Sequence, residues 1–502
     1  MSIPSKTTVL VIGGGPGGSY TASALAREGI DTVLLEAEIF PRYHIGESLV
    51  ASIRPLLKFI DLDDTFVNYE RSSFQAEQPE GSLYADSMYV KYRLTILDTD
   101  FILDPGTGTY AWNVIRSECD DLMFKHARQS GASTFDGVKV TSIEFIPDEN
   151  DVESPGRPVS ASWKAKDGRT GMIDFKYLVD ASGRSGITST KYLKNRTFNN
   201  YLKNVASWGY WRNATPYGVG TPVEGQPYFE ALQDGSGWVW FIPLHNGTTS
   251  IGVVMNQEMA TKKKKQSSVT SSRAFYLESI GGARAISCLL EPATLEGDIK
   301  QASDWSYNAS AYGSPYLRVV GDAGAFIDPY FSSGVHLALS GGLSAATSVC
   351  ASLRGDCEEE AAWKWHSQSV ANRYGRFLLV VLGATKQIRA RDRPVLNKEG
   401  EDGFDDAFTV IRPVIQGIAD VPGRATPREV LDAVAFSKSV MDPSTGEGGQ
   451  SWVERHHGAL SSDEQEVGKV MNNLAKAYKA QDVYEGLAAR LKRGELGLQV
   501  AN

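Results

Sequence analysis

The residues best suited to hold a ligand stand near the start of the chain, in the glycine-rich run Gly13 to Gly18. The run follows the apolar stretch Val9 to Ile12 and precedes a segment with helical periodicity, so it predicts a turn between a strand and a helix. Such a turn brings backbone N–H groups and the positive end of the helix dipole to a pyrophosphate. Glu36, at the end of the next predicted strand, can then bind ribose hydroxyls. The expected dinucleotide-binding residues are Gly13, Gly14, Gly15, Gly17, Gly18 and Glu36.

Two later segments decide which dinucleotide fits. Gly321 to Ala325 follows the predicted strand Leu317 to Val320, and Asp322 taken alone could be a helix N-cap. Together with Leu178 to Arg184 and with Arg116, however, the segment resembles the FAD motifs of the flavoprotein hydroxylase superfamily. The resemblance implies that Asp322 contacts the ribityl chain, that Arg116 contacts the flavin, and that the cofactor is FAD.

The loop Pro41 to Ser48 corresponds to the superfamily's loop beside the flavin. The resemblance implies that Arg42 and Glu47 bind the cofactor, and the Gly-Glu-Ser ending of the loop is typical of halogenases. His44 in the same loop could act in catalysis, but we prefer a histidine satisfied by a local hydrogen bond.

A pair of tryptophans narrows the reaction. Trp238 and Trp240 stand in the run Trp238 to Pro243, where strand alternation places both indoles on one face. By itself such a stripe indicates an aromatic core. In an FAD-binding frame the run is similar to the WxWxIP signature of flavin-dependent halogenases, and the chain most resembles the fungal phenolic halogenases, such as those that chlorinate resorcylic lactones.

That resemblance implies a mechanism. In the family a separate reductase supplies reduced FAD, O2 gives a flavin hydroperoxide, and chloride or bromide is oxidised to hypohalous acid. Residues at the places of Trp238 and Trp240 keep the organic substrate away from the hydroperoxide. Amides at Ser333 and Gly334 hold the halide, and Val335 touches the flavin. Consecutive N–H groups at a helix start form an anion nest, although the same residues could be an ordinary helix start.

The family's catalytic lysine, which presents electrophilic chlorine to the ring, is missing from its expected place near Phe74. The similarity breaks after Tyr69 and resumes at Thr99. Lys91 is the only lysine in the stretch Glu70 to Leu97. Either Lys91 is a displaced catalytic residue, or the protein lacks this lysine, or the stretch reflects a mistaken splice or reading frame, the hypothesis that we prefer. Sequencing the transcript across codons 70 to 98 tests it.

Two other functions suit the same FAD frame. An aromatic hydroxylase would form hydroxylated product without halide; Trp238, Trp240 and Pro243 argue against it, and the missing lysine argues for it. A catalytically impaired flavin-binding protein would show no halide-dependent turnover. For a halogenase we expect a free, electron-rich phenol of polyketide metabolism as substrate, with a carrier-tethered one as the alternative.

These residues must be positioned by an α/β fold. We expect an FAD-binding, Rossmann-like doubly wound domain of the flavoprotein hydroxylase type, with an inserted antiparallel sheet and a helical C-terminal region. The expected domains are 1–190 plus 300–345 for FAD, 191–299 for the inserted sheet with the substrate tunnel, and 346–502 for a helical substrate region. The lysine run Lys262 to Lys265 is expected in a solvated loop.

The composition excludes several partners. A net charge of -9 gives no basic footprint for nucleic acid, and the four cysteines lack metal-binding spacing. The longest strongly apolar stretch, Phe377 to Ala384, is far shorter than the roughly 20 residues that span a bilayer. The N-terminus leads directly into a strand instead of a signal peptide. We therefore expect a cytoplasmic protein without a metal, a membrane or nucleic acid as partner.

Overall fold

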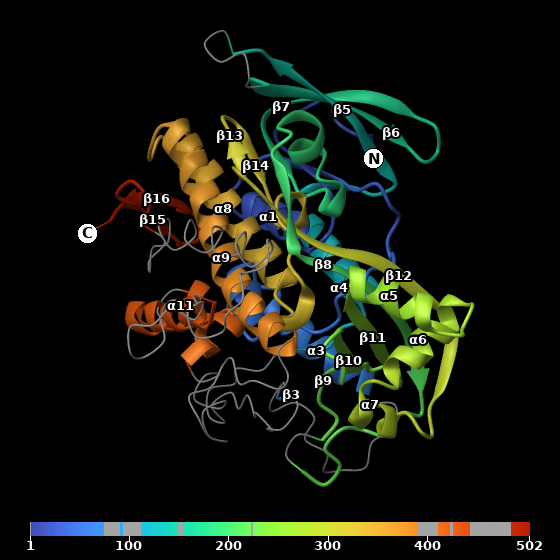
Figure 1. The fold of residues 1–502 in the computed structure, drawn as a ribbon. Helices are drawn as coiled ribbons and strands as arrows, with labels where there is room; N and C mark the ends of the chain where they lie inside the picture. Colours follow the sequence, from blue (N-terminus) through green and yellow to red (C-terminus); the bar gives the residue numbers. More distant parts are fainter. Residues whose placement is uncertain are drawn as a thin grey trace.

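The described part of the computed structural model contains two large sheets, a small two-stranded one and a layer of long helices (Figure 1). The structure describes residues 2–74, 91–93, 112–148, 155–221, 224–389, 410–421, 425–441 and 483–501. The helices are α1 (Pro16–Arg27), α2 (Ile53–Phe59), α3 (Asp63–Phe74), α4 (Arg116–Gln129), α5 (Gln257–Gln266), α6 (Ser272–Ile280), α7 (Arg284–Leu289), α8 (Gly334–Arg354), α9 (Glu359–Arg389) and α11 (Pro427–Met441). The predicted α/β class, with an inserted sheet and a helical C-terminal region, is confirmed.

The first sheet has eight strands, of which β14, β7, β1, β2 and β4 run parallel in that order. Its strands are β1 (Lys6–Ile12), β2 (Thr32–Leu35), β4 (Ser133–Phe135), β5 (Val138–Ile146), β6 (Arg157–Ala165), β7 (Thr170–Asp180), β13 (Gly313–Ser314) and β14 (Leu317–Val319). Alternation along β1 sends Val9 and Val11 to a core shared with α1, α4 and α8. Leu10 and Ile12 face the opposite core, which β5 and β6 cover. Helices α1, α4 and α8 therefore pack on one side of the parallel strands, and the antiparallel strands β5 and β6 of the same sheet fold over the other side.

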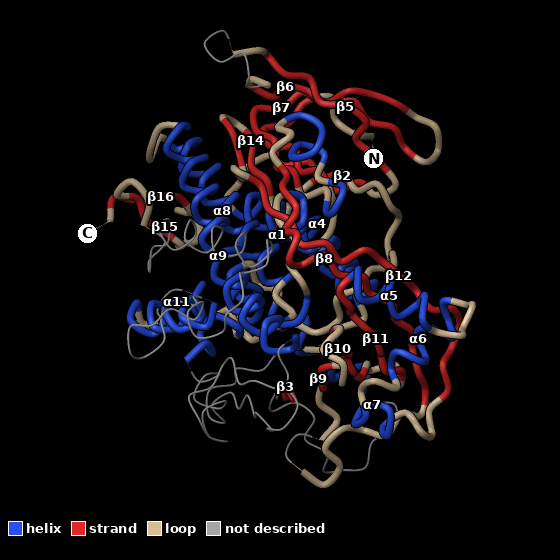
Figure 2. Tube along the Cα trace, viewed as in Figure 1, coloured by secondary structure: helices blue, strands red, loops and turns tan. Residues whose placement is uncertain are grey.

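The second sheet is antiparallel except where β3 joins β9, and its order is β12-β8-β11-β10-β9-β3. Its strands are β3 (Lys91–Arg93), β8 (Arg196–Arg212), β9 (Tyr228–Ala231), β10 (Gly237–Pro243), β11 (Thr248–Asn256) and β12 (Thr294–Ala309). Figure 2 shows β8 and β12 continuing the band of strands from the first sheet to the second. Because β12 pairs with β8 as far as Ala309, the second sheet continues beyond residue 299.

The two faces of the second sheet have different neighbours. Val239 and Phe241 of β10 face a core formed with α6 and α7. The alternate residues Trp238 and Trp240 face the core of the first sheet, as the strand alternation predicts. The expected loop at Lys262 to Lys265 is wrong, because the Asn256 side chain caps a helix there, α5, by accepting hydrogen bonds from two backbone N–H groups.

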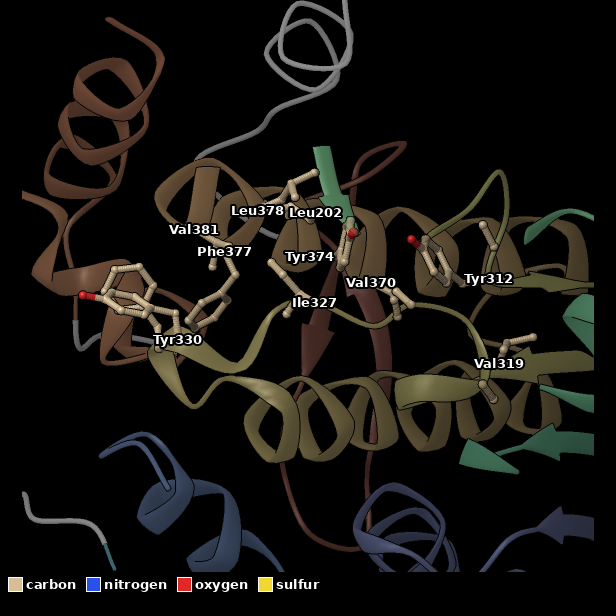
Figure 3. Close-up of a cluster of buried hydrophobic side chains, with 14 of the residues drawn as sticks. Leu202, Tyr312, Val319, Ile327, Tyr330, Val370, Tyr374, Phe377, Leu378 and Val381 are labelled. Carbon is tan, nitrogen blue, oxygen red and sulfur yellow. The ribbon is translucent and has the colours of Figure 1, made fainter. Parts of the chain in front are cut away.

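The C-terminal region is built around α8 and α9. Figure 3 shows Phe377 of α9 directed toward Tyr330 in the segment before α8, and Tyr374 and Ile327 belong to the same buried cluster. A hairpin of β15 (Leu487–Arg490) and β16 (Gly497–Val500) returns to α8. Among the described residues, α8 is the one helix long and apolar enough to cross a membrane, but 83% of that stretch is buried inside the fold, as in a core helix.

Candidate active site

A cavity of about 930 Å³ is lined by residues from both sheets and from the start of α8. It brings together most of the site residues predicted from the sequence. These are Gly13, Gly15, Gly17, Glu36, Arg42, Glu47, Arg116, Trp238, Trp240, Asp322, Gly334 and Val335. Three further predicted residues, Gly14, Gly18 and Ser333, are chain neighbours of these but do not line the cavity. The lining residues come from segments that are far apart in the sequence, and the fold brings them into one site.

The glycine turn combines tight packing with an open face. Gly13 has a φ of +99°, and an added Cβ would lie 2.2 Å from the carbonyl oxygen of Ala181. At Gly18 an added Cβ would lie 1.9 Å from the carbonyl oxygen of Gly13. At Gly15, which caps α1, the nearest atom would be Arg42 Nη2 at 3.4 Å. The backbone of Gly15 is thus open to the cavity, a cradle that fits a pyrophosphate.

Glu36 is fixed where β2 ends. Its Oε2 accepts a hydrogen bond from the Gly14 N–H at 2.6 Å, and its Oε1 accepts one from the Glu38 N–H at 2.8 Å. These bonds tie the carboxylate to the glycine turn while it lines the cavity. The position fits the predicted ribose-binding carboxylate.

A buried carboxylate that the sequence reasoning missed holds both predicted arginines. Asp120 accepts hydrogen bonds from Arg42 Nη1 at 2.9 Å and from Arg116 Nε at 2.9 Å. Arg116 Nη1 also donates to the carbonyl of Ile45 at 2.7 Å, which fixes the loop beside the cavity. Burial alone would raise the pKa of Asp120, but the charges of Arg116 and Arg42 outweigh it, so the pKa is lowered. The four-residue spacing of Arg116 and Asp120 on α4 was the available signal.

Asp322 stands in a helical turn (Gly321–Ala323) that directly follows β14. Burial raises the pKa of its carboxyl to about 6, against the opposing charges of Arg184, Arg116 and Arg196. A raised pKa means that the folded state binds the proton more tightly than the unfolded state, whose ordinary value is 3.8. This group therefore makes the FAD-free protein less stable as the pH rises from 3.8 to about 6.

We expect Asp322→Asn to reduce that loss of stability. Melting temperatures of the FAD-free variant and of the parent, measured from pH 4 to 7, should converge at low pH and separate in favour of the variant as the pH rises. Asp64→Asn, at an exposed carboxylate on α3, is the control and should follow the parent. Parallel curves for Asp322→Asn and the parent would show that Asp322 does not titrate as its burial predicts.

The two tryptophans form one wall of the cavity. The ring centroids of Trp238 and Trp240 are 5.9 Å apart, and Trp208 on β8 lies 6.3 Å from Trp240. The Trp240 indole N–H donates to Ser250 Oγ at 3.1 Å, and Gly252 leaves the space that this indole occupies. The stripe is therefore both packed core and cavity wall, with its indoles held in fixed orientations.

A chain of hydroxyl groups beside this wall was also missed. Tyr210 donates to Glu47 Oε1 at 2.7 Å, and its oxygen lies 3.0 Å from the hydroxyl of Tyr43. Tyr43 in turn accepts a hydrogen bond from the Trp208 indole at 2.6 Å. Burial raises the pKa of Glu47. Because Tyr210 is 163 residues from Glu47 in the chain, no local spacing could have indicated the pair.

The turn before α8 has the form expected of an anion nest. Ser332 adopts a positive φ of 53°, Ser333 precedes the helix, and Gly334 and Val335 line the cavity. Ser333 is fully buried, and among the described residues its Oγ has no hydrogen-bond partner. A buried polar atom without a partner is costly, so this position favours a ligand.

Lys91 is the first residue of the edge strand β3 and pairs with Tyr228 of β9. Its side chain lies outside what the structure describes, as does most of the stretch Glu70 to Leu97. His44 bonds through Nδ1 to the Ile45 carbonyl at 2.6 Å, the local partner that we expected.

The fold and the cavity define a flavoprotein, and comparison with known proteins agrees. A family model described as an FAD binding domain matches residues 6–369. Flavin-dependent halogenase otaD of Aspergillus carbonarius is 73% identical over 506 residues, covering 100% of both chains. Sulochrin halogenase gedL of Aspergillus terreus is 49% identical over 530 residues, covering 100% of this chain and 95% of the relative. The chain belongs to the flavin-dependent halogenase family.

A solved structure shows the same fold. The myxobacterial chondrochloren halogenase CndH matches with a TM-score of 0.69 and 24% identity, covering 98% of this chain and 100% of the other. The family model and the curated relatives confirm the family and the cofactor predicted from the sequence: the chain is an FAD-dependent oxidoreductase of the halogenase family.

Proposed function

We propose that this enzyme chlorinates a free, electron-rich phenol, and that chloride, or bromide in its place, and O2 are its co-substrates. The observation that carries the proposal is the single cavity lined by the FAD cradle, by the start of α8 and by the tryptophan wall. The relative named sulochrin halogenase, 49% identical, supports a small phenolic substrate.

Different residues of the chain would bind different parts of FAD. The open backbone of Gly15 would face the pyrophosphate, Glu36 the ribose, and Asp322 and Arg116 the ribityl chain and the flavin. Reduced FAD, supplied by a separate reductase, would activate O2 and thereby provide the oxidant for the halide. Asp120 keeps Arg42 and Arg116 in place for this task.

The halide would rest on the N–H groups of Ser333 and Gly334. The positive end of the 21-residue α8 helix and the lack of a side-chain cap at its start favour an anion there. Trp238 and Trp240 would separate the halide side of the cavity from the phenol, which suppresses direct hydroxylation. Their packed rings also exclude water from the oxidised halogen.

Lys91 remains a candidate for transferring the halogen. The two alternatives are that the protein lacks the catalytic lysine, or that the stretch Glu70 to Leu97 reflects a mistaken splice or reading frame. An ammonium group suits this role because it can donate a proton to the departing hydroxide. Lys91→Ala separates this role of Lys91 from the two alternatives. A variant that binds FAD and makes peroxide, but no halogenated product, would assign the transfer to Lys91.

We also propose the surroundings in which the reaction takes place. The FAD domain would comprise 1–190 and 300–345, apart from residues 300–309, where β12 continues the second sheet. The inserted sheet of 191–299 would form the tunnel, and the helical region 346–502 the phenol site. The reductase would deliver reduced FAD by diffusion in the cytoplasm.

The proposal is tested with FAD reduced anaerobically and then mixed with enzyme, O2, halide and either monochlorodimedone or resorcinol-type phenols. Mass spectrometry should find halogenated phenol that depends on enzyme and halide and persists in the presence of catalase. Hydroxylated product, or peroxide alone, would contradict the phenol halogenase proposal and support one of the two alternative functions.

A further inference from the structure

A buried carboxylate outside the cavity connects the tryptophan wall to the turn before α8. Asp328 is 1% exposed and does not line the cavity, although its neighbours Ile327 and Pro329 do. It caps the short helical turn Pro329–Phe331, because its Oδ1 accepts a hydrogen bond from the Tyr330 N–H at 3.0 Å. This turn leads directly into Ser332 and the start of α8.

The same carboxylate reaches two strands of the second sheet. Its Oδ2 accepts a hydrogen bond from Asn204 Nδ2 of β8 at 2.7 Å. Burial raises the pKa of this carboxyl, and the neighbouring Trp238 side chain on β10 opposes that rise. The ring of Tyr330 meets the Trp238 ring edge to face, with centroids 5.1 Å apart. Asp328 therefore joins the cap of the turn, β8 and the tryptophan wall in one buried network.

The N–H groups around Asp328 favour a side chain that offers only hydrogen-bond acceptors. Tyr330 and Asn204 each donate an N–H to this carboxylate, and the neighbouring Trp238 side chain carries a third N–H. An asparagine at 328 would turn an NH2 group toward at least one of these donors. A buried donor left without an acceptor costs far more than an ordinary hydrogen bond contributes.

We propose that Asp328 is a positioning residue that holds the Trp238 indole and the Ser333–Gly334 turn in a fixed geometry relative to each other. It acts through these groups, without touching the halide or the phenol. The inference rests on the proposed halide site at Ser333 and Gly334. Its consequence is that halide binding and exclusion of the phenol depend on one carboxylate.

The test compares Asp328→Asn with Asp63→Asn. Asp63 is also buried and also paired, through Arg54, but it lies on α3, and it controls for the loss of a buried carboxylate. Asp328→Asn should keep the parent's affinity for FAD, raise the halide KM about tenfold and lower the ratio of halogenated product to peroxide by a similar factor. Asp63→Asn should change stability and leave both activity measures alone.

Trp238→Phe, which removes the indole N–H and keeps a ring, completes a double-mutant cycle. If Asp328 acts through Trp238, the double variant should lose less than the product of the two single effects. Strict additivity, or a parent-like KM and product ratio in Asp328→Asn, would overturn the inference. Where Asp328→Asn does not fold, Asn204→Ala removes one donor and should shift both measures in the same direction by about threefold.

A spectroscopic measurement separates this inference from the proposed reaction. The near-ultraviolet circular dichroism band of Trp238 is obtained as the difference between the parent and Trp238→Phe. Asp328→Asn should weaken or shift this band, whatever product the enzyme forms. An unchanged band would overturn the link between Asp328 and Trp238 even if phenol halogenation is established.

Discussion

Replacing Gly18 by alanine is expected to give a protein that no longer retains FAD. The added Cβ would lie 1.9 Å from the Gly13 carbonyl oxygen and 3.2 Å from Ala181 Cβ. Backbone atoms cannot turn aside as a flexible side chain can, so α1 would have to move away from β1. That movement displaces Gly15 and the N–H groups at the start of α1, which we expect to bind the pyrophosphate.

The expected loss of FAD affinity is at least about 100-fold, equivalent to about 2.7 kcal/mol. Fluorescence titration with FAD, and the flavin absorbance that remains after gel filtration, measure it. Gly341→Ala is the matched control, because a Cβ there would meet its nearest atoms at 3.7 Å and alanine favours the interior of α8. A Gly18→Ala protein that binds FAD as tightly as the Gly341→Ala protein would contradict the role of this contact.

Local pattern was sufficient for the frame of the site. The strand, turn and helix around Gly13 to Gly18 follow from apolar periodicity and glycine spacing. Strand alternation was likewise sufficient to put Trp238 and Trp240 on one face, because each strand fixes its own side-chain directions. Both features are properties of continuous segments.

The residues that hold the site in place could not be found in this way. Asp328 is hydrogen-bonded to Asn204, which is 124 residues away in the chain, and Tyr210 is hydrogen-bonded to Glu47, which is 163 residues away. Such partners are selected by how the two sheets pack, which periodicity within one segment does not report. At α5 a local signal was overlooked. The lysine run Lys262 to Lys265 was predicted to be a loop, but the Asn256 side chain caps a helix there despite the repulsion between the lysines.

Ser52, His336 and Asp420 form a buried cluster that supports the start of α8. His336 Nδ1 lies 2.7 Å from Ser52 Oγ, and His336 Nε2 lies 2.7 Å from Asp420 Oδ2. Asp420 is also ion-paired with Arg376 of α9. The order of groups resembles a hydrolytic triad, but Ser52 is 1% exposed and none of the three lines the cavity. The cluster therefore joins the C-terminal region to the turn that precedes His336.

We expect His336→Ala to lower the free energy of unfolding by about 3 kcal/mol, because Asp420 and Ser52 each lose a buried partner. Urea denaturation measures the change. His245→Ala is the control; His245 pairs with Glu118 at a partly exposed site, so its removal should cost below about 1 kcal/mol. Equal losses in the two variants would mean that the cluster adds no more than a surface pair.

The pH dependence of the same variant identifies the group responsible. Burial alone would raise the pKa of Asp420, but Arg376 and His336 outweigh it and hold the pKa below its ordinary value of 3.8. A lowered pKa contributes stability that is present above pH 3.8 and is lost as the pH falls through the lowered value. Without His336 the pKa of Asp420 rises toward 3.8, so the acid unfolding of His336→Ala should begin at a higher pH than in the parent. Acid unfolding curves that differ only by a constant offset would instead assign the lost stability to packing around the imidazole.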